Sequence, residues 1–220
     1  MPKPTSEEMS RIGRSNVRRS KSHERRVAHL LTDWAGVEFR RRRVEGRDST
    51  VIERESTADV IPVKGDILFS IEAKCGECTS LDGLLSNPMS NKFTGWWHQC
   101  VYDAELLSAT FKRKFYPLLF FKPHPNFDWI AVDQEVFVSK ILTPTEAAKP
   151  SHVLASDHNM PIWMPNIAYD GYNLVGPVTH DVSHSKKHPV MKTLTLPSLY
   201  MIRWKDFAHT VNPTSVFVQT

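Results

Sequence analysis

The stretch ADVIPVKGDILFSIEAK, residues 58–74, decides the fold. Two strand-like runs, 59–63 and 67–74, flank a turn that contains Gly65, and this pattern predicts an antiparallel hairpin. A two-residue loop and a four-residue loop give the same strand register. The four-residue loop suits Pro62 better, because it places this residue at a pair where a backbone N–H is not needed.

The predicted register brings charged side chains together. Asp59 lies directly opposite Glu72, and facing Cβ atoms in such a pair are about 4.5–5.5 Å apart. Alternate residues of a strand share a face, so Lys74 lies on the same side as Glu72. Asp66, six residues before Glu72, is about 20 Å away on an extended chain and cannot share a site with it.

This grouping indicates a particular chemistry. Two facing carboxylates repel each other unless a cation or a shared proton lies between them. Mg²⁺ would resolve this repulsion, because it prefers oxygen ligands and uses one or two carboxylates together with water and phosphate. Lys74 would then hold the attacking water or offset the charge of the scissile phosphate. The pattern predicts metal-assisted hydrolysis of a phosphodiester.

Basic residues are concentrated near the N-terminus. Residues 1–54 hold 14 Lys and Arg against 8 Asp and Glu, a net +6, so the other 166 residues sum to −2 of the chain's +4. Such a concentration is the expected footprint of a polyanion such as a nucleic acid, although a solvated tail would show the same charge. The predicted DNA-binding residues are Arg11, Arg14, Arg18, Arg19, Lys21, Arg25, Arg26, Arg40, Arg41, Arg42 and Arg43.

The N-terminal region is predicted to contain an arm and a helix. Residues 1–21 lack apolar periodicity and are expected to form a flexible basic arm. A helix of about 13 residues should follow Ser22 and end at Gly36. Glu24 lies on its first turn, at the rim of the inward-facing side, and is by itself either an acid that complements the helix dipole or a site residue.

The rest of the chain predicts an α/β layered domain. Strands are expected at 116–122 and 129–132, and helices at about 96–109 and 135–140. Residues 141–192 carry six prolines and five histidines with little periodicity. We expect an insertion or extended loop region there, with a functional or partner-binding role or partial disorder. Residues 193–220 return to apolar patterning and are expected to complete the core.

The run STADVIPVKGDILFSIEAK, with SHERRVAHLL upstream and GWWHQCVYDAE and PLLFFK downstream, resembles the PD-(D/E)XK nuclease superfamily. It is most similar to the branch that contains archaeal Holliday-junction resolvases and related phage and bacterial proteins. The resemblance covers about residues 20–132 and implies a restriction-endonuclease-like core, here 22–140, with a mixed central sheet flanked by helices. One departure is Ala58, which stands where the superfamily's name has Pro.

The resemblance implies a role for each site residue. Asp59, Glu72 and the backbone carbonyl of Ala73 would bind Mg²⁺ or Mn²⁺, and Lys74 would serve the attacking water. Glu24 would complete the metal shell directly or through water. Gln99, on the helix after the motif, would orient Lys74 or a phosphate.

The expected function is a metal-dependent DNA endonuclease, most similar to a Holliday-junction or branched-DNA resolvase that acts as a homodimer. The alternatives are a restriction-type or single-strand nuclease of the same superfamily, and a DNA-binding protein that keeps the fold without catalysis. No apolar run approaches the roughly 20 residues of a membrane span, and no signal-peptide core is present. We therefore expect a cytoplasmic protein with no membrane partner, acting in the host cytoplasm if it is virus-encoded.

Two other motifs invite different interpretations. Cys75 and Cys78 have Cys-x-x-Cys spacing, and His98 and Cys100 would complete four zinc ligands, but this second pair is poorly spaced and the cysteines are better explained as loop residues near the site. The spacing of His180, His184 and His188 suggests a metal ladder, but nearby prolines disfavour the helix it needs.

Overall fold

The fold is described from a computed structural model, which covers residues 5–42, 57–75, 92–124, 127–141, 162–166, 171–175, 178–181, 193–196 and 199–217. The helices are α1 (Ser6–Ala35), α4 (Lys92–Phe111), α5 (Gln134–Val136) and α7 (Trp204–Thr210), with a π-helical turn at Phe137–Ile141 and a 3₁₀ turn at Pro213–Val216. The strands are β1 (Phe39–Arg41), β2 (Val60–Pro62), β3 (Phe69–Cys75), β4 (Tyr116–His124), β5 (Phe127–Asp133), β6 (Ile162–Asn166), β7 (Gly171–Val175), β8 (Val178–Asp181), β9 (Thr193–Leu196) and β10 (Leu199–Arg203).

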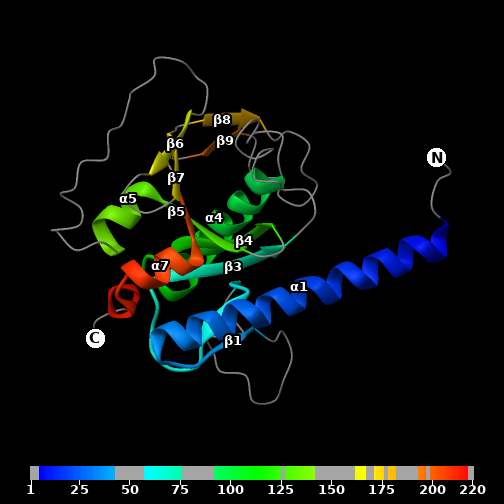
Figure 1. The fold of residues 1–220 in the computed structure, drawn as a ribbon, viewed down its shortest axis with the longest axis horizontal. Coiled ribbons are helices and arrows are strands. Elements are labelled where there is room, and N and C mark those ends of the chain that lie inside the picture. Colours follow the sequence, from blue (N-terminus) through cyan, green and yellow to red (C-terminus); the bar gives the residue numbers. More distant parts are fainter. Residues whose placement is uncertain are drawn as a thin grey trace.

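A mixed sheet forms the centre of the protein (Figure 1). Within the described residues it has eight strands in the order β1-β2-β3-β4-β5-β10-β7-β6, and β8 and β9 pair separately. Strands β3 and β4 are parallel, because α4 crosses over between them, whereas the other neighbours are antiparallel. The predicted mixed α/β sheet flanked by helices is confirmed.

The sheet is buried on both faces, which explains the unbroken apolar run of β4. Leu118 and Phe120 belong to a core cluster with α1 and α7, whereas Leu119 and Phe121 belong to a cluster with α4. Along β3, Phe69, Ile71 and Ala73 face the α1 side. Ser70 and Glu72 therefore point to the α4 side.

Helix α1 is longer than the sequence pattern indicated. It starts at Ser6 with a capping box between Thr5 and Glu8, and ends at Gly36, whose N–H donates to Thr32 O. The prediction of a flexible arm followed by a helix start at Ser22 is wrong for residues 6–21. The extra turns bury nothing, so apolar periodicity could not reveal them, whereas the capping box could have.

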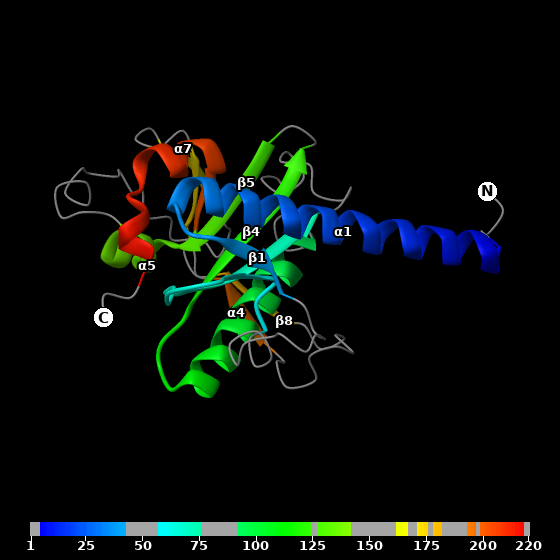
Figure 2. The same ribbon diagram turned by 90° about the horizontal axis from the view of Figure 1, so that it is seen from below.

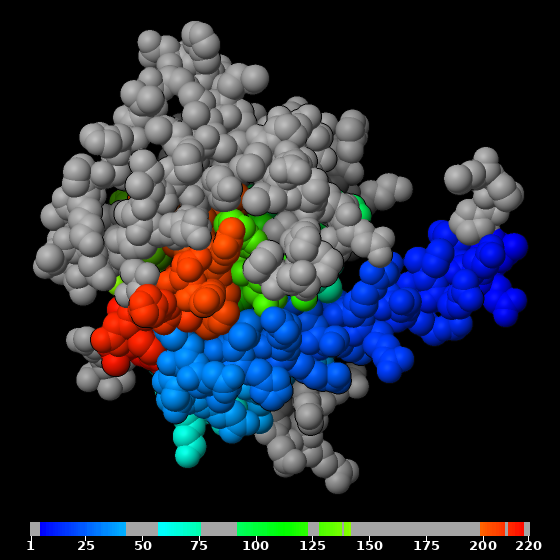
Figure 3. Space-filling view, in the orientation of Figure 1, coloured from blue at the N-terminus to red at the C-terminus, as the bar shows by residue number. Residues whose placement is uncertain are grey.

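The N-terminal half of α1 projects from the body of the protein. With 30 residues the helix is about 45 Å long, and Figures 1, 2 and 3 show its first turns extending beyond the sheet. The overhang lies at the end of the sheet where β3 reaches its carboxyl terminus (Figures 1 and 2).

An ion pair and a buried histidine fix α1 at the point where it meets the sheet. Arg26 donates from Nε and Nη2 to Asp128 Oδ2 of β5, at 2.9 and 2.7 Å. The buried His23 places Nδ1 4.0 Å from Asp128 Oδ1. Burial lowers the pKa of His23 to about 4, although Asp128 opposes this shift, so His23 is neutral near pH 7.

The region 141–192, where we expected an insertion or extended loop, contains strands among its described residues. β7 pairs with β10 and β6 pairs with β7, so both extend the main sheet. β6 includes Pro165, which obscured the strand pattern but is tolerated because β6 lies at the sheet edge.

Candidate active site

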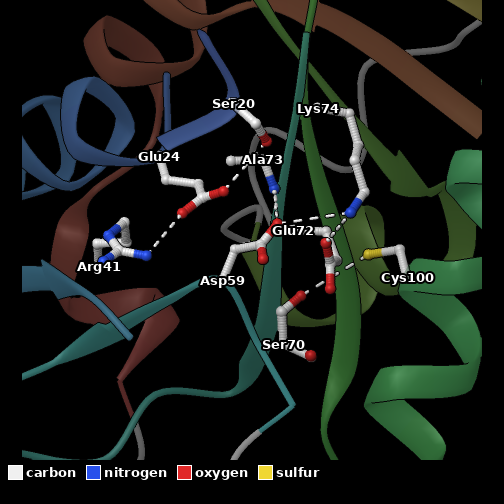
Figure 4. Close-up of polar contacts among 9 residues, drawn as sticks. All are labelled: Ser20, Glu24, Arg41, Asp59, Ser70, Glu72, Ala73, Lys74 and Cys100. Carbon is white, nitrogen blue, oxygen red and sulfur yellow. Dashed lines mark hydrogen bonds and ion pairs between the residues drawn. The ribbon is translucent and has the colours of Figure 1, made fainter. Parts of the chain in front are cut away.

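Asp59, Glu72 and Lys74 meet where β2 begins and β3 ends, as the hairpin register predicts. Lys74 Nζ lies 2.7 Å from Glu72 Oε2 and 3.6 Å from Asp59 Oδ2. Figure 4 shows the lysine and the glutamate on the side of β3 that faces Cys100 of α4. Side-chain exposure rises from 1% at Glu72 to 18% at Lys74 and 25% at Asp59, so the cluster opens to solvent beside Asp59.

Backbone contacts fix the position of Asp59. Val60 pairs with Ile71, as the predicted register requires, and Asp59 N–H donates to Ile71 O. On its other side, Asp59 O accepts from Arg42 N–H of the segment after β1. The carboxylate accepts a 3.0 Å hydrogen bond from Ala73 N–H. The side chain is therefore held against β3 with one oxygen beside Lys74.

A third carboxylate, Asp103 of α4, completes the cluster, and the sequence analysis missed it. Asp103 is 8% exposed, and its side chain is close enough to the Glu72 carboxyl group to help raise the pKa of that group. Cys100, Ala104 and Leu107 recur at helical spacing and form a buried stripe along α4. An acid at the border of that stripe was the signal that could have revealed Asp103.

Burial and neighbouring charges strongly perturb this cluster. Burial, followed by the hydrogen bond and charge of Asp59, raises the pKa of Glu72 to about 10. Burial alone would lower the pKa of Lys74, but the Glu72 and Asp59 carboxylates outweigh it and raise that pKa. One ammonium thus faces three carboxyl groups, and the excess of oxygen donors and negative charge favours a hard divalent cation.

The donor chemistry fits Mg²⁺ or Mn²⁺, but the described residues form no complete cage of protein ligands. Over the described ranges, no group of three or more His, Cys, Asp and Glu side chains is arranged to hold a metal ion. Mg²⁺ in proteins commonly keeps several waters and uses one or two carboxylates. Asp59 and Glu72 supply that number.

Two other predicted site residues lie near the cluster without joining it. Glu24 accepts from Ser20 Oγ at 3.1 Å and pairs with Arg41 Nη1 at 3.4 Å. Figure 4 places its carboxylate on the α1 side of Asp59. Gln99 is half-buried on α4, one turn before Asp103. Neither contacts Asp59, Glu72 or Lys74 through a hydrogen bond or ion pair among the described residues.

The predicted DNA-binding residues divide into different groups. Five of them recur along the sequence at alternating spacings of three and four residues, which places their side chains on one face of α1. All five are exposed. They are Arg11, Arg14, Arg18, Lys21 and Arg25. Arg19 is also exposed. Arg26 and Arg41 are ion-paired with Asp128 and Glu24, Arg40 and Arg42 are half-buried, and Arg43 lies outside the described residues.

The cysteines do not form a metal site among the described residues. Cys100 is buried and its thiol contacts Ser70 O at 3.8 Å, while burial raises its pKa well above the ordinary value. Cys75 is half-buried at the end of β3. Cys78 and the histidines at 184 and 188 lie outside the described residues.

A mixed sheet flanked by helices, with Asp59, Glu72 and Lys74 at the end of a hairpin, is the arrangement of a PD-(D/E)XK nuclease. A family model described as "Phage putative PDDEXK endonuclease" matches residues 16–160. The chain therefore belongs to this family and to the PD-(D/E)XK superfamily. No curated protein and no solved structure matches the chain. No helix of the described chain is long and apolar enough to cross a membrane.

Proposed function

We propose that the protein is a Mg²⁺- or Mn²⁺-dependent endonuclease that hydrolyses phosphodiester bonds in DNA. One observation supports this most strongly: Lys74 lies between Asp59 and Glu72 in a cluster that carries more carboxyl groups than ammonium groups. Membership of an endonuclease family supports the same function.

The chain's own residues would divide the work of hydrolysis. Asp59, Glu72 and the carbonyl of Ala73 would hold the cation, with Glu24 acting directly or through water. When bound, the cation supplies charge that polarises the phosphate and lowers the pKa of a water ligand. Lys74 would donate a hydrogen bond to the attacking water or to a phosphate oxygen, offsetting the negative charge that develops there. Gln99 would orient Lys74 or a phosphate.

DNA would reach this site along α1. Helix α1 leaves the sheet beside the carboxyl end of β3 (Figures 1 and 2), and the five exposed basic residues run along one face of it, from the projecting part to the point where the helix meets the sheet. We call Arg11, Arg14, Arg18, Lys21 and Arg25 the basic stripe. Over its 15 residues, 11–25, the stripe is about 20 Å long, enough to follow several phosphates of one strand.

Branched DNA, such as a Holliday junction, is the proposed substrate, and a homodimer is the proposed active form. Both follow from the similarity to resolvases, since symmetric resolution needs two cuts. The protein would act in the cytoplasm of an infected host, in keeping with the phage family.

Cleavage of defined substrates tests the function. A four-way junction, a linear duplex and a single strand are incubated with the protein in Mg²⁺ or EDTA. We expect cleavage only with Mg²⁺, a loss of about 100-fold or more in Lys74→Ala, and wild-type rates in Asp66→Asn. Asp66 pairs with Arg113, away from the cluster.

The substrate pattern decides among nuclease types. Paired symmetric nicks confined to the junction would establish a resolvase, and sedimentation would show whether a dimer makes them. Cleavage of duplex or single strand would indicate a different nuclease of the superfamily. Binding without metal-dependent cleavage would overturn the enzymatic proposal.

A further inference from the structure

Asp103 lies at the meeting point of three elements. Its carboxyl group is close enough to Glu72 of β3 to help raise the pKa of that residue. Its backbone oxygen accepts a 2.9 Å hydrogen bond from Thr57 Oγ1, in the segment that leads to Asp59. Asp103 as a whole is 8% exposed and lies on the face of α4 that covers the site. Asp103 is therefore part of the same buried cluster as Asp59, Glu72 and Lys74.

The fold does not need the carboxylate of Asp103. The bond from Thr57 uses the backbone oxygen, which any residue at this position would supply. The Asp103 carboxylate acts electrostatically on the groups around the candidate site, and it helps to raise the pKa of Glu72, Lys74 and the Cys100 thiol. Burying a carboxylate beside other acidic groups costs stability. An Asn would avoid that cost and could still accept a hydrogen bond from a protonated Glu72, so the acid calls for a functional explanation.

The position of Lys74 suggests a function for the Asp103 carboxylate. Its ammonium lies between Asp59 and Glu72, 3.6 and 2.7 Å from them, in the place where a cation held by both carboxylates must bind. A bound cation would repel the ammonium and take both of its partners. Lys74 then needs another anion to stay at the site, and Asp103 is the neighbouring carboxylate that the cation leaves free.

We infer that Asp103 is a positioning residue that holds Lys74 beside the scissile phosphate once Asp59 and Glu72 bind the metal. This inference rests on the proposed nuclease function. Asp103 touches neither substrate nor metal in this role; it acts through Lys74. Its removal should slow the chemical step and leave the affinity for DNA almost unchanged.

Cleavage kinetics with a matched control test the inference. Asp103→Asn should lower kcat about 10- to 100-fold, with KM for DNA within about twofold of wild type. The control, Asp66→Asn, makes the same chemical change at an Asp outside the cluster and should keep the wild-type kcat. Asp103→Glu, which restores the charge, should recover part of the lost rate.

A double-mutant cycle shows whether Asp103 acts through Lys74. In a Lys74→Met background, Asp103→Asn should reduce the remaining rate by less than about twofold, because the group it positions is gone. A structural role would instead lower the rate by the same factor in both backgrounds. Should Asp103→Asn melt below the assay temperature, Asp103→Glu is measured in the same cycle.

The outcomes separate this inference from the proposed function. If the wild type cleaves DNA and Asp103→Asn cleaves at the same rate, the positioning role is wrong and the nuclease function stands. Equal effects in the two backgrounds would also refute the role. If the wild type cleaves none of the substrates with Mg²⁺ or Mn²⁺, the nuclease function fails, and the inference fails with it.

Discussion

The ammonium of Lys74 lies 2.7 Å from Glu72 Oε2, so the lysine occupies the space beside a buried carboxyl group where a metal ion would bind. A divalent cation must compete with it. We therefore predict that Lys74→Met binds Mn²⁺ or Ca²⁺ about tenfold more tightly than wild type in the absence of DNA, equivalent to about 1.4 kcal/mol. The same variant should cleave DNA at least about 100-fold more slowly.

Isothermal titration calorimetry measures this metal affinity directly. Lys64→Met is the matched control, since Lys64 is exposed in the hairpin turn and should not alter metal binding. Weaker metal binding by Lys74→Met would show that the lysine supports the metal site instead of competing with the metal.

The raised pKa of Glu72 predicts how stability depends on pH. Because the folded protein raises this pKa from 4.5 to about 10, the proton on Glu72 stabilises the fold, and this stability is lost as pH rises toward the folded-state value. In EDTA, the wild-type Tm should fall between pH 6.5 and 9.5, whereas Glu72→Gln should melt higher at pH 9 and change less with pH. A shift of 1 kcal/mol corresponds to about 2–4 °C in a protein of this size.

The measurement is confined to pH 6.5–9.5 because His23 affects the stability of the fold only at more acidic pH. Its pKa is lowered from 6.5 to about 4, so its contribution is lost as pH falls below 6.5 and does not affect the alkaline range. Mg²⁺ should raise the wild-type Tm at pH 9 but have little effect on Glu72→Gln. A wild-type Tm that stays constant from pH 6.5 to 9.5 would contradict the assigned state of Glu72.

The sequence predicted those parts of the site that follow from local rules. Strand alternation and one turn fixed the register, and the register was enough to bring Asp59 to Glu72 and Lys74. Asp103 could not be found this way, because its place depends on how α4 rotates over β3. That rotation follows from packing of Trp97, Cys100 and their neighbours in the core, which no single local pattern specifies.

The ends of the fold were predicted poorly for a related reason. Apolar periodicity reports burial, so it locates α1 only from His23 onward, where the helix touches the sheet. Residues 6–22 are helical because of a capping box and local propensity. Strands β6 and β7 have five residues each. They depend on the pairing of β7 with β10 and of β6 with β7, and such non-local pairing is only weakly evident in the sequence.

The basic stripe of α1 predicts a salt-dependent affinity for DNA. Each phosphate contact releases a counterion, so the slope of log K against log salt should fall by about 0.9 for each stripe residue that loses its charge on duplex DNA. Replacing Arg14, Arg18 and Lys21 by Gln should reduce the slope by about 2–3 and leave the Tm unchanged. Fluorescence anisotropy at several salt concentrations, with Ca²⁺ in place of Mg²⁺, measures this slope.

An exposed lysine outside the stripe gives the control for this measurement. Lys205 lies on the surface of α7, and Lys205→Gln should leave the slope as it is. An unchanged slope in the triple variant would mean that DNA follows another path to the site.

Arg25 and Arg26 are neighbours in the sequence, but we expect Arg25 to bind DNA and Arg26 to stabilise the fold. Arg25 belongs to the exposed stripe, whereas Arg26 pairs with Asp128, whose side chain is 5% exposed. Removing Arg26 leaves a buried carboxylate without its guanidinium partner, so Arg26→Gln should destabilise the protein by about 1–3 kcal/mol. Arg25→Gln should change stability by less than about 0.5 kcal/mol and instead weaken DNA binding. Urea denaturation and anisotropy measure the two effects on both variants. Equal losses of DNA affinity with no difference in stability would show that Arg26 also faces DNA and that its ion pair with Asp128 does not hold α1 on the sheet.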